Sequence, residues 1–268
     1  MPVRTHESQA VLRFLRIALL LYLLAFVAAG TLIESREATN WDYALRVVVY
    51  PIAGDSSSAV AEHIDTLTSE RFRSIETFLA REAVRHSLPL DAPVRITLAP
   101  ERGARIPELE RGASRPGILL WSLRMRWAAM RLAWNSDIPK PDITLFAVFH
   151  DSDTNTVLDS STALRKGLIA IANVYATPRQ AGSNDVVMAH ELLHTIGATD
   201  KYSLSTLQPD YPIGYIEPDR QPLHPQRFTE IMAGRRAVSE SQAEMPASLR
   251  NVRLGAVTAR EIGWRSPQ

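Results

Sequence analysis

The chain has 268 residues, of which 46% are hydrophobic and 22% are charged, and its formal net charge is +1 at pH 7. This is the composition of an ordinary globular protein, and the near-neutral charge argues against a nucleic-acid partner. The chain has no cysteine, which excludes disulfides, thiolate metal sites and thiol nucleophiles.

The first element along the chain is an apolar run near the N-terminus. Three arginines precede this run, which covers residues 17–33. Seventeen residues is close to the shortest length that spans a bilayer, and a positively charged flank is expected to stay in the cytoplasm. We therefore predict a cytoplasmic segment at 1–16, a transmembrane signal anchor at 17–33, and a domain at 34–268 on the periplasmic side of a bacterial-type inner membrane. The alternative is a signal peptide cleaved after the small residues at 27–29, which would release a secreted protein.

The rest of the chain alternates between strand and helix patterns. Runs rich in β-branched and aromatic residues predict strands, and apolar residues at three- and four-residue spacing predict helices. These patterns give strands at 44–52, 94–98, 142–150 and 167–176, and helices at 55–87, 118–134, 184–196 and 257–264. Together they predict an α+β fold with a mixed, twisted sheet of four or five strands.

The helix expected at 118–134 interleaves aromatic and basic side chains. Its tryptophans and arginines are Trp121, Arg124, Arg126, Trp127, Arg131 and Trp134. We interpret this segment as a core helix with an arginine outer face. A face that binds nucleic acid or a membrane surface is the alternative interpretation.

A cluster of acidic residues follows the strand at 142–150. Asp151, Asp153, Asn155 and Asp159 have a spacing that resembles a calcium-binding loop, but Thr156 stands where such a loop requires glycine. We therefore predict a solvated hairpin loop here.

The residues best suited to chemistry lie between positions 190 and 200. His190 and His194 are four residues apart, so on a helix their imidazoles share one face and can reach one metal ion. Glu191 projects beside them, where it can act on a water activated by the metal rather than bind the metal. Gly197 can adopt the left-handed conformation that ends a helix and turns the chain. Asp200 then falls where a third ligand is needed, which leaves a fourth position open for water and substrate.

This pattern resembles the extended His-Glu-x-x-His-x-x-Gly-x-x-His motif of the metzincin zinc peptidases, with Asp200 where the third histidine is usual. A variant with aspartate at that position is known in the snapalysin-type bacterial peptidases. The resemblance covers residues 165–234. It implies a zincin-like fold with an active-site helix and one catalytic zinc ion, held by His190, His194 and Asp200, and it implies that Glu191 is the general base.

Further candidates surround this site. Metzincins carry a methionine turn beneath the metal, and Met232 is the best candidate for it. In zincins a strand upstream of the metal helix forms the rim of the cleft, so residues 167–175 are the candidate for pairing with an extended substrate; an ordinary interior strand is the alternative. One of Tyr202, Tyr211 and Tyr215 could donate a hydrogen bond to the developing oxyanion, and Tyr202 is the preferred candidate. His224 and Glu217 are alternative third ligands.

The predicted function is a membrane-anchored zinc metallopeptidase that hydrolyses an extended polypeptide, with Glu191 passing a proton from the attacking water to the leaving amine. Two alternatives stay open: a metal-dependent amidase acting on cell-wall peptides, and a non-catalytic, membrane-tethered zinc-binding module. A purely structural zinc site would need four protein ligands, whereas the motif offers three ligands and an adjacent glutamate.

Overall fold

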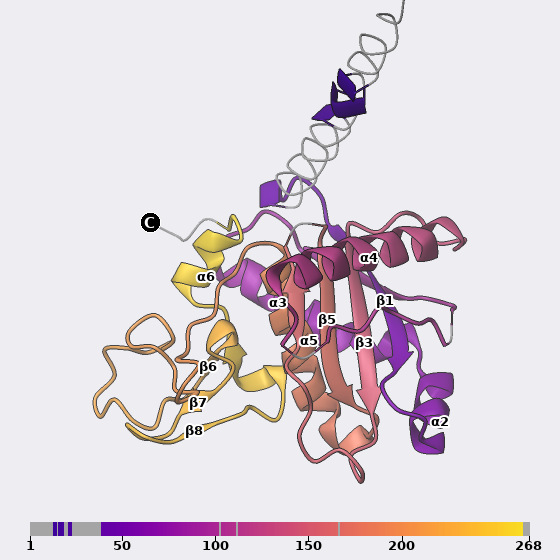
Figure 1. Ribbon diagram of the computed structural model, residues 1–268. Coiled ribbons are helices and arrows are strands. Elements are labelled where there is room, and N and C mark those ends of the chain that lie inside the picture. The colour runs from indigo at the N-terminus through magenta and orange to yellow at the C-terminus, as the bar shows by residue number, and fades with distance from the viewer. Residues whose placement is uncertain are drawn as a thin grey trace, which may run out of the picture.

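The computed structural model describes residues 13–14, 16–18, 21–22, 39–101, 103–110, 112–165 and 167–264. Its centre is one five-stranded sheet with the strand order β2-β1-β3-β5-β4 (Figure 1). The first four strands in this order are parallel and β4 is antiparallel to β5. The strands are β1 (Leu45–Ala53), β2 (Val94–Leu98), β3 (Ile143–His150), β4 (Thr162–Leu164) and β5 (Ile169–Tyr175). The predicted α+β fold with a mixed sheet is confirmed, although β4 was not among the predicted strands.

The central strands are apolar along nearly their whole length because both faces of the sheet are covered. In β3, seven of the eight residues are buried. Such uninterrupted burial is typical of parallel strands that lie between two layers of helices. The strand patterns in the sequence therefore predicted the sheet well.

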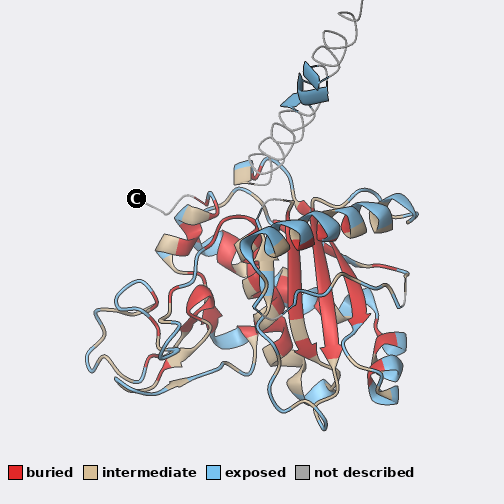
Figure 2. Ribbon diagram, viewed as in Figure 1, coloured by how far each residue is buried: buried red, intermediate tan, exposed pale blue. Residues whose placement is uncertain are grey.

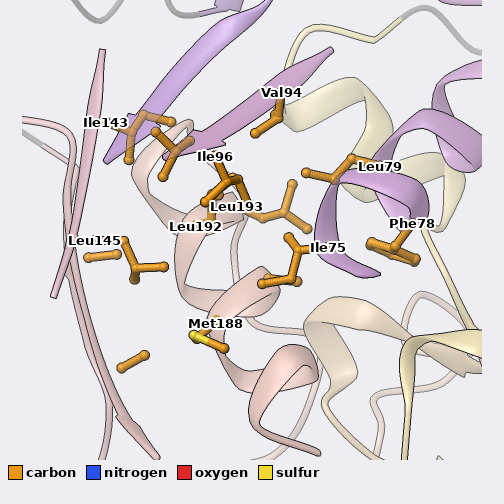
Figure 3. Packing of buried hydrophobic residues seen from close by; sticks show 14 of the residues in the cluster. Ile75, Phe78, Leu79, Val94, Ile96, Ile143, Leu145, Met188, Leu192 and Leu193 are labelled. Atoms are coloured by element: carbon orange, nitrogen blue, oxygen red, sulfur yellow. The ribbon is translucent and has the colours of Figure 1, made fainter. Parts of the chain in front are cut away.

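One face of the sheet packs against three helices, namely α2 (Ser58–Thr66), α3 (Arg73–Arg85) and α5 (Ala181–Thr195). Figure 3 shows the centre of this layer, where side chains of α3 and α5 meet those of β2 and β3. The residues labelled there are Ile75, Phe78, Leu79, Val94, Ile96, Ile143, Leu145, Met188, Leu192 and Leu193. The largest hydrophobic cluster of the protein thus lies directly behind the helix that carries the histidine motif.

The opposite face of the sheet is covered by α4 (Arg115–Trp134). Trp121, Met125 and Ala129 of this helix are buried against strand residues that include Tyr50 and Phe146. The prediction of a helix that packs onto the core is confirmed. The predicted arginine outer face is wrong, because most of the outward side chains are apolar.

The single long helix predicted at 55–87 is also wrong. The chain forms α2, then a short 3₁₀ turn at Ser69–Phe72, then α3. The break lies at Leu67, which has an extended backbone (φ −65°, ψ 139°) and a buried side chain. Burying this leucine in the core takes precedence over continuing the helical pattern.

The structure does not support the prediction of a transmembrane helix at 17–33. No helix among the described residues is both long and apolar enough to cross a membrane, which takes about 20 mostly apolar residues in one helix. The 20-residue α4 has the length, but it carries four arginines. Most of the 17–33 run, and the alternative cleavage site at 27–29, lie outside the described residues. The predicted single-pass anchor, and with it the placement at an inner membrane, is therefore not supported.

The C-terminal region contains only short elements beside the sheet (Figure 1, orange and yellow). They are β6 (Thr229–Glu230), β7 (Arg236–Ala237), β8 (Ala243–Glu244), β9 (Val252–Arg253) and α6 (Ala256–Glu261). Figure 2 shows that burial in this region is concentrated in a few segments. Polar contacts therefore contribute much of what holds it together.

Two buried glutamates make these contacts. Glu82 of α3 accepts a hydrogen bond from the backbone N–H of Leu254. Glu230 accepts four hydrogen bonds, from the backbone N–H groups of Met232, Ala233 and Gly255 and from the hydroxyl of Thr258. Burial raises the pKa of Glu230, and these four donors oppose that effect by stabilising the carboxylate. Glu230 thereby holds the turn at Ile231–Ala233 in one conformation.

Candidate metal centre

The helix α5 positions the histidine motif against the core. The sequence favours Ser183 or Asn184 as the N-cap of this helix, which is wrong, because the helix begins at Ala181 and both residues lie inside it. The amide of Asn184 instead pairs with both backbone groups of Tyr175 at the end of β5. Asp185 accepts hydrogen bonds from Arg71 and from Ser74 of α3. These side chains fix α5 relative to the sheet and to α3.

Three potential ligand atoms converge at the C-terminal end of α5. The Nε2 atoms of His190 and His194 lie 3.0 Å apart. Asp200 Oδ1 lies 3.2 Å from the first of these atoms and 3.1 Å from the second. In a tetrahedral zinc site with bonds of about 2.0–2.1 Å, neighbouring ligand atoms are separated by about 3.3 Å. The triangle formed by these three atoms is close to that size.

Both imidazoles are oriented by backbone carbonyls. His190 Nδ1 donates to the carbonyl of Ile231 at 3.0 Å, and His194 Nδ1 donates to that of Ala198 at 2.8 Å. A carbonyl only accepts hydrogen bonds, so each Nδ1 carries a proton, and once Nε2 loses its own proton to bind a metal, its lone pair is directed into the site. Carbonyl partners of this kind fix the tautomer and orientation of metal-binding histidines. Two lone pairs and a carboxylate that face one another make a donor set suited to a cation.

Glu191 lies beside these atoms and completes a group that could hold a metal ion. One ligand atom from each of His190, Glu191 and His194 lies within 4.8 Å of the others. Burial raises the pKa of Glu191, the two histidines lower it, and the charge of Asp200 raises it further, with a net increase. A carboxylate whose pKa is raised toward neutrality is a better proton acceptor.

Asp200 and His194 influence each other electrostatically. Burial raises the pKa of Asp200, but hydrogen bonds and charge from both histidines outweigh it and hold that pKa well below its ordinary value. Burial lowers the pKa of His194, but Asp200 and the carbonyl of Ala198 reverse the direction and raise it. Asp200 therefore keeps its negative charge beside the two histidines.

The turn that brings Asp200 to the histidines depends on Gly197. The predicted left-handed conformation is confirmed, with φ of +111°. A side chain here would also be crowded, because an added Cβ would lie 3.0 Å from the guanidinium of Arg165 and 3.2 Å from the carbonyl of Glu261. Glycine satisfies both constraints, and this allows the chain to reverse within three residues of the helix end.

A buried lysine that sequence reasoning missed anchors the same turn. The ammonium of Lys201 donates to the carbonyl and hydroxyl of Thr199 and, at 2.7 Å, to Glu261. The side chain of Lys201 is 1% exposed, and its backbone N–H donates to the carbonyl of Met232. These contacts fix the residues on both sides of Asp200. No local pattern indicates them, since Glu261 lies 60 residues away.

This ion pair predicts a pH-dependent contribution to stability. Burial raises the pKa of Glu261, but hydrogen bonds from Lys201 and Thr199 outweigh it and hold the pKa below its ordinary 4.5. A depressed pKa in the folded state stabilises the protein above about pH 4.5, and that stabilisation is lost as the pH falls further. We expect Glu261→Gln to cost about 3 kcal/mol at pH 7, with the difference from wild type shrinking below pH 4.5.

The measurement is thermal unfolding from pH 7 to pH 3 in the presence of a chelator, so that metal binding does not contribute. Glu62→Gln on the exposed surface of α2 is the matched control and is expected to unfold like the wild type throughout. A difference for Glu261→Gln that stays constant down to pH 3 would contradict the assignment.

The residues that carry the three atoms lie in the wall of a cleft of about 390 Å³. It is lined by the motif residues of α5, by residues around β4 and by residues of the turn after α5, namely Ser161, Thr162, Ala163, Arg165, Gly197, Ala198, Thr199, Asp200 and Tyr202. Tyr202 is part of this lining. Burial and the nearby charges of Asp200 and Glu191 raise its pKa, which keeps its hydroxyl protonated and able to donate.

The strand at the rim of the cleft differs from the predicted one. The predicted strand corresponds to β5, which is paired on both sides, with β3 and with β4. Its alternative interpretation as an ordinary interior strand is therefore confirmed. The sheet edge at the cleft is β4, and Thr162 and Ala163 from this strand line the cleft. At three residues, β4 is too short to recognise from a strand pattern.

Of the remaining candidates, Met232 lies next to the site and the alternative ligands do not. Met232 is buried, and its turn contacts the site through the carbonyls of Ile231 and Met232. The alternative ligands do not line the cleft: His224 contacts the hydroxyl of Tyr215, and Glu217 forms an ion pair with Arg227. The predicted hairpin at 151–159 is wrong, because this segment joins β3 to β4 and β5 lies between those two strands in the sheet. The side chains of Asp151 and Asn155 form hydrogen bonds within the segment and to Ser57 and Asp55, so the segment is a connecting loop.

No protein-family model matches this chain, and no curated protein matches it either. The geometry of the site is therefore the basis on which a function is assigned.

Proposed function

We propose that this protein is a zinc-dependent peptidase in which His190, His194 and Asp200 hold one zinc ion and Glu191 is the general base. The observation that carries the proposal is the convergence of two imidazole lone pairs and a carboxylate oxygen within 3.0–3.2 Å, beside a buried glutamate and an open cleft. Three protein ligands with an open fourth position are typical of catalytic zinc, whereas structural zinc usually has four protein ligands.

The donor set favours zinc and favours Asp200 over Glu191 as the third ligand. Imidazole nitrogen with carboxylate oxygen suits zinc, while magnesium and calcium prefer oxygen ligands alone. Asp200 Oδ1 lies about 3.1–3.2 Å from both Nε2 atoms, close to the separation of ligands on one ion. We also propose that the fold is zincin-like, as the resemblance to metzincins implies, and that Met232 forms the methionine turn beneath the metal.

Bound there, zinc would supply a Lewis acid that polarises the scissile carbonyl and makes a water more acidic. Glu191 accepts the proton of the attacking water and transfers it to the leaving amine. Its raised pKa suits both steps, because the group must take up a proton and then release it. The hydroxyl of Tyr202 donates a hydrogen bond to the substrate oxygen on which negative charge develops.

The substrate we propose is a polypeptide in extended form. The strand β4 forms the edge of the sheet and pairs only on its β5 side among the described residues. An extended peptide can add to such an edge by backbone hydrogen bonds. Because Thr162 and Ala163 line the cleft, a peptide paired with β4 would pass close to Glu191.

The proposal is tested by metal analysis and removal. We expect about one zinc per chain by elemental analysis. We also expect the protein to cleave an unfolded polypeptide such as reduced casein, to lose this activity in a chelator, and to regain it when zinc is restored. Cleavage that persists after the metal is removed would contradict the proposal. Cleavage of cell-wall peptides with none of casein would favour the amidase alternative, because that reaction can use the same metal site.

The role of Tyr202 makes a separate prediction. Tyr202→Phe removes one hydroxyl and is expected to lower kcat roughly 10²-fold with little change in KM, since the hydrogen bond forms mainly in the transition state. Steady-state kinetics on one peptide substrate measures both constants. The control is Tyr211→Phe, an exposed tyrosine that does not line the cleft. An unchanged kcat in Tyr202→Phe would assign Tyr202 to packing alone.

A further inference from the structure

The outer face of α4 is an apolar stripe with nothing packed against it among the described residues. Trp134 is 84% exposed, and Trp127 and Leu119 are each 63% exposed. The other exposed members are Leu120, Leu123 and Met130. Spacings of three and four residues place these side chains on one side of the helix, opposite the buried Trp121, Met125 and Ala129. Figure 2 shows α4 largely exposed along its length, in contrast to the buried strands beneath it.

Arginines border this stripe. Arg124 and Arg131 are seven residues apart, so they lie one above the other along one border. Both are exposed, and within the described part of the chain neither forms an ion pair. Arg126 lies on the opposite border, where its side chain packs beside Gly167. The helix contains four arginines and no aspartate or glutamate.

We propose that α4 binds the surface of an anionic lipid membrane and lies in the plane of the interface. Exposed tryptophans and leucines would enter the boundary between headgroups and acyl chains, and the bordering arginines would bind lipid phosphates. Long arginine side chains suit this position, because their stems cover apolar surface while their charged ends reach the headgroups. This surface contact is independent of any membrane-spanning segment and of the proposed peptidase activity.

The arrangement of charge favours lipid over two other partners. Nucleic acid would contact a basic surface, but the centre of this face is Leu123, Trp127 and Met130, with the arginines at its borders. A second copy docked through α4 would bring the arginines of two helices together, and the helix has no acidic residue to pair with them. An anionic membrane satisfies the apolar stripe and the arginines at once.

Tryptophan fluorescence of the full chain tests the proposal, with vesicles whose acyl chains carry bromine as a quencher. Trp127 and Trp134 are exposed, whereas Trp41, Trp121 and Trp264 are at most 7% exposed, so quenching reports on α4. We expect quenching with vesicles of phosphatidylglycerol and phosphatidylcholine, and weak quenching with phosphatidylcholine alone. The double variant Trp127→Phe/Trp134→Phe should lose the quenching.

Charge variants test the role of the arginines. Arg124→Gln/Arg131→Gln is expected to raise the lipid concentration at half-maximal quenching roughly 30-fold. The matched control Arg95→Gln/Arg179→Gln removes the same charge from exposed positions outside α4. It should leave the lipid concentration at half-maximal quenching unchanged. Circular dichroism checks that each variant is folded.

Four results would overturn the proposal. The first is absence of quenching with every vesicle, and the second is equal quenching by neutral and anionic vesicles that Arg124→Gln/Arg131→Gln does not change. The third is concentration-dependent dimerisation that Leu123→Ser abolishes, in the absence of quenching by lipid. The fourth is salt-dependent binding of an oligonucleotide in place of lipid. The last two would assign the face to a second copy or to nucleic acid.

Discussion

Glu191→Gln is expected to lower peptide hydrolysis by about 10²–10⁴-fold while the protein keeps its metal. The glutamine side chain has nearly the same shape and fits the same buried position, but its amide cannot take up the proton of the attacking water. His190, His194 and Asp200 are unchanged, so the three converging atoms remain. The measurement is kcat/KM on a peptide substrate, together with zinc content per chain from the same preparation.

The matched control is Glu240→Gln, which makes the same chemical change at an exposed position. It should leave both activity and zinc content as in the wild type. If Glu191→Gln retains more than a tenth of the wild-type kcat/KM, Glu191 is not the general base. If it loses both zinc and activity, Glu191 contributes to metal binding, and the third ligand must be assigned again.

Asp200→Ala is expected to lower zinc affinity by more than the roughly 10–100-fold that loss of an outer hydrogen-bond partner costs, because it removes a direct ligand. Its carboxylate lies within 3.2 Å of both Nε2 atoms and supplies the negative charge of the triangle. We expect the purified variant to contain much less than one zinc per chain and to be inactive. Competition with a zinc-binding dye measures the affinity.

His224→Ala is the control for this experiment, since His224 is the alternative ligand that the sequence offered and it lies outside the cleft lining. That variant should retain its zinc. The opposite pattern, with zinc kept by Asp200→Ala and lost from His224→Ala, would contradict the proposed ligand set. Thermal unfolding in chelator distinguishes lost affinity from lost folding.

The local parts of the site were predictable from the sequence. Two histidines four residues apart on a helix share a face whatever the rest of the chain does, and the structure brings their Nε2 atoms within 3.0 Å. Gly197 could be predicted for the same reason, because a left-handed turn at a helix end requires little more than the glycine itself. The four parallel strands were predictable because burial on both faces leaves uninterrupted apolar runs.

Other features depend on contacts between distant residues. The strand β4 exists as an edge because β5 pairs with it, and the ion pair of Lys201 with Glu261 joins residues 60 positions apart. The carbonyl that orients His190 belongs to Ile231, 41 residues away. Side-chain type does not indicate such pairings, because a backbone carbonyl or a lysine looks the same in the sequence whether or not its partner is near.

The helix α4 shows most clearly the difference between what the local sequence determines and what contacts between distant residues determine. Its apolar residues recur at helical spacing on two opposite sides, so the sequence predicts a helix but does not say which side faces the sheet. Packing of Trp121, Met125 and Ala129 against the strands assigns one side to the core and leaves Leu123, Trp127 and Trp134 outside. Periodicity along the chain is a local property and determines the helix, whereas the choice of buried face depends on the shape of the sheet that the helix meets in the folded protein.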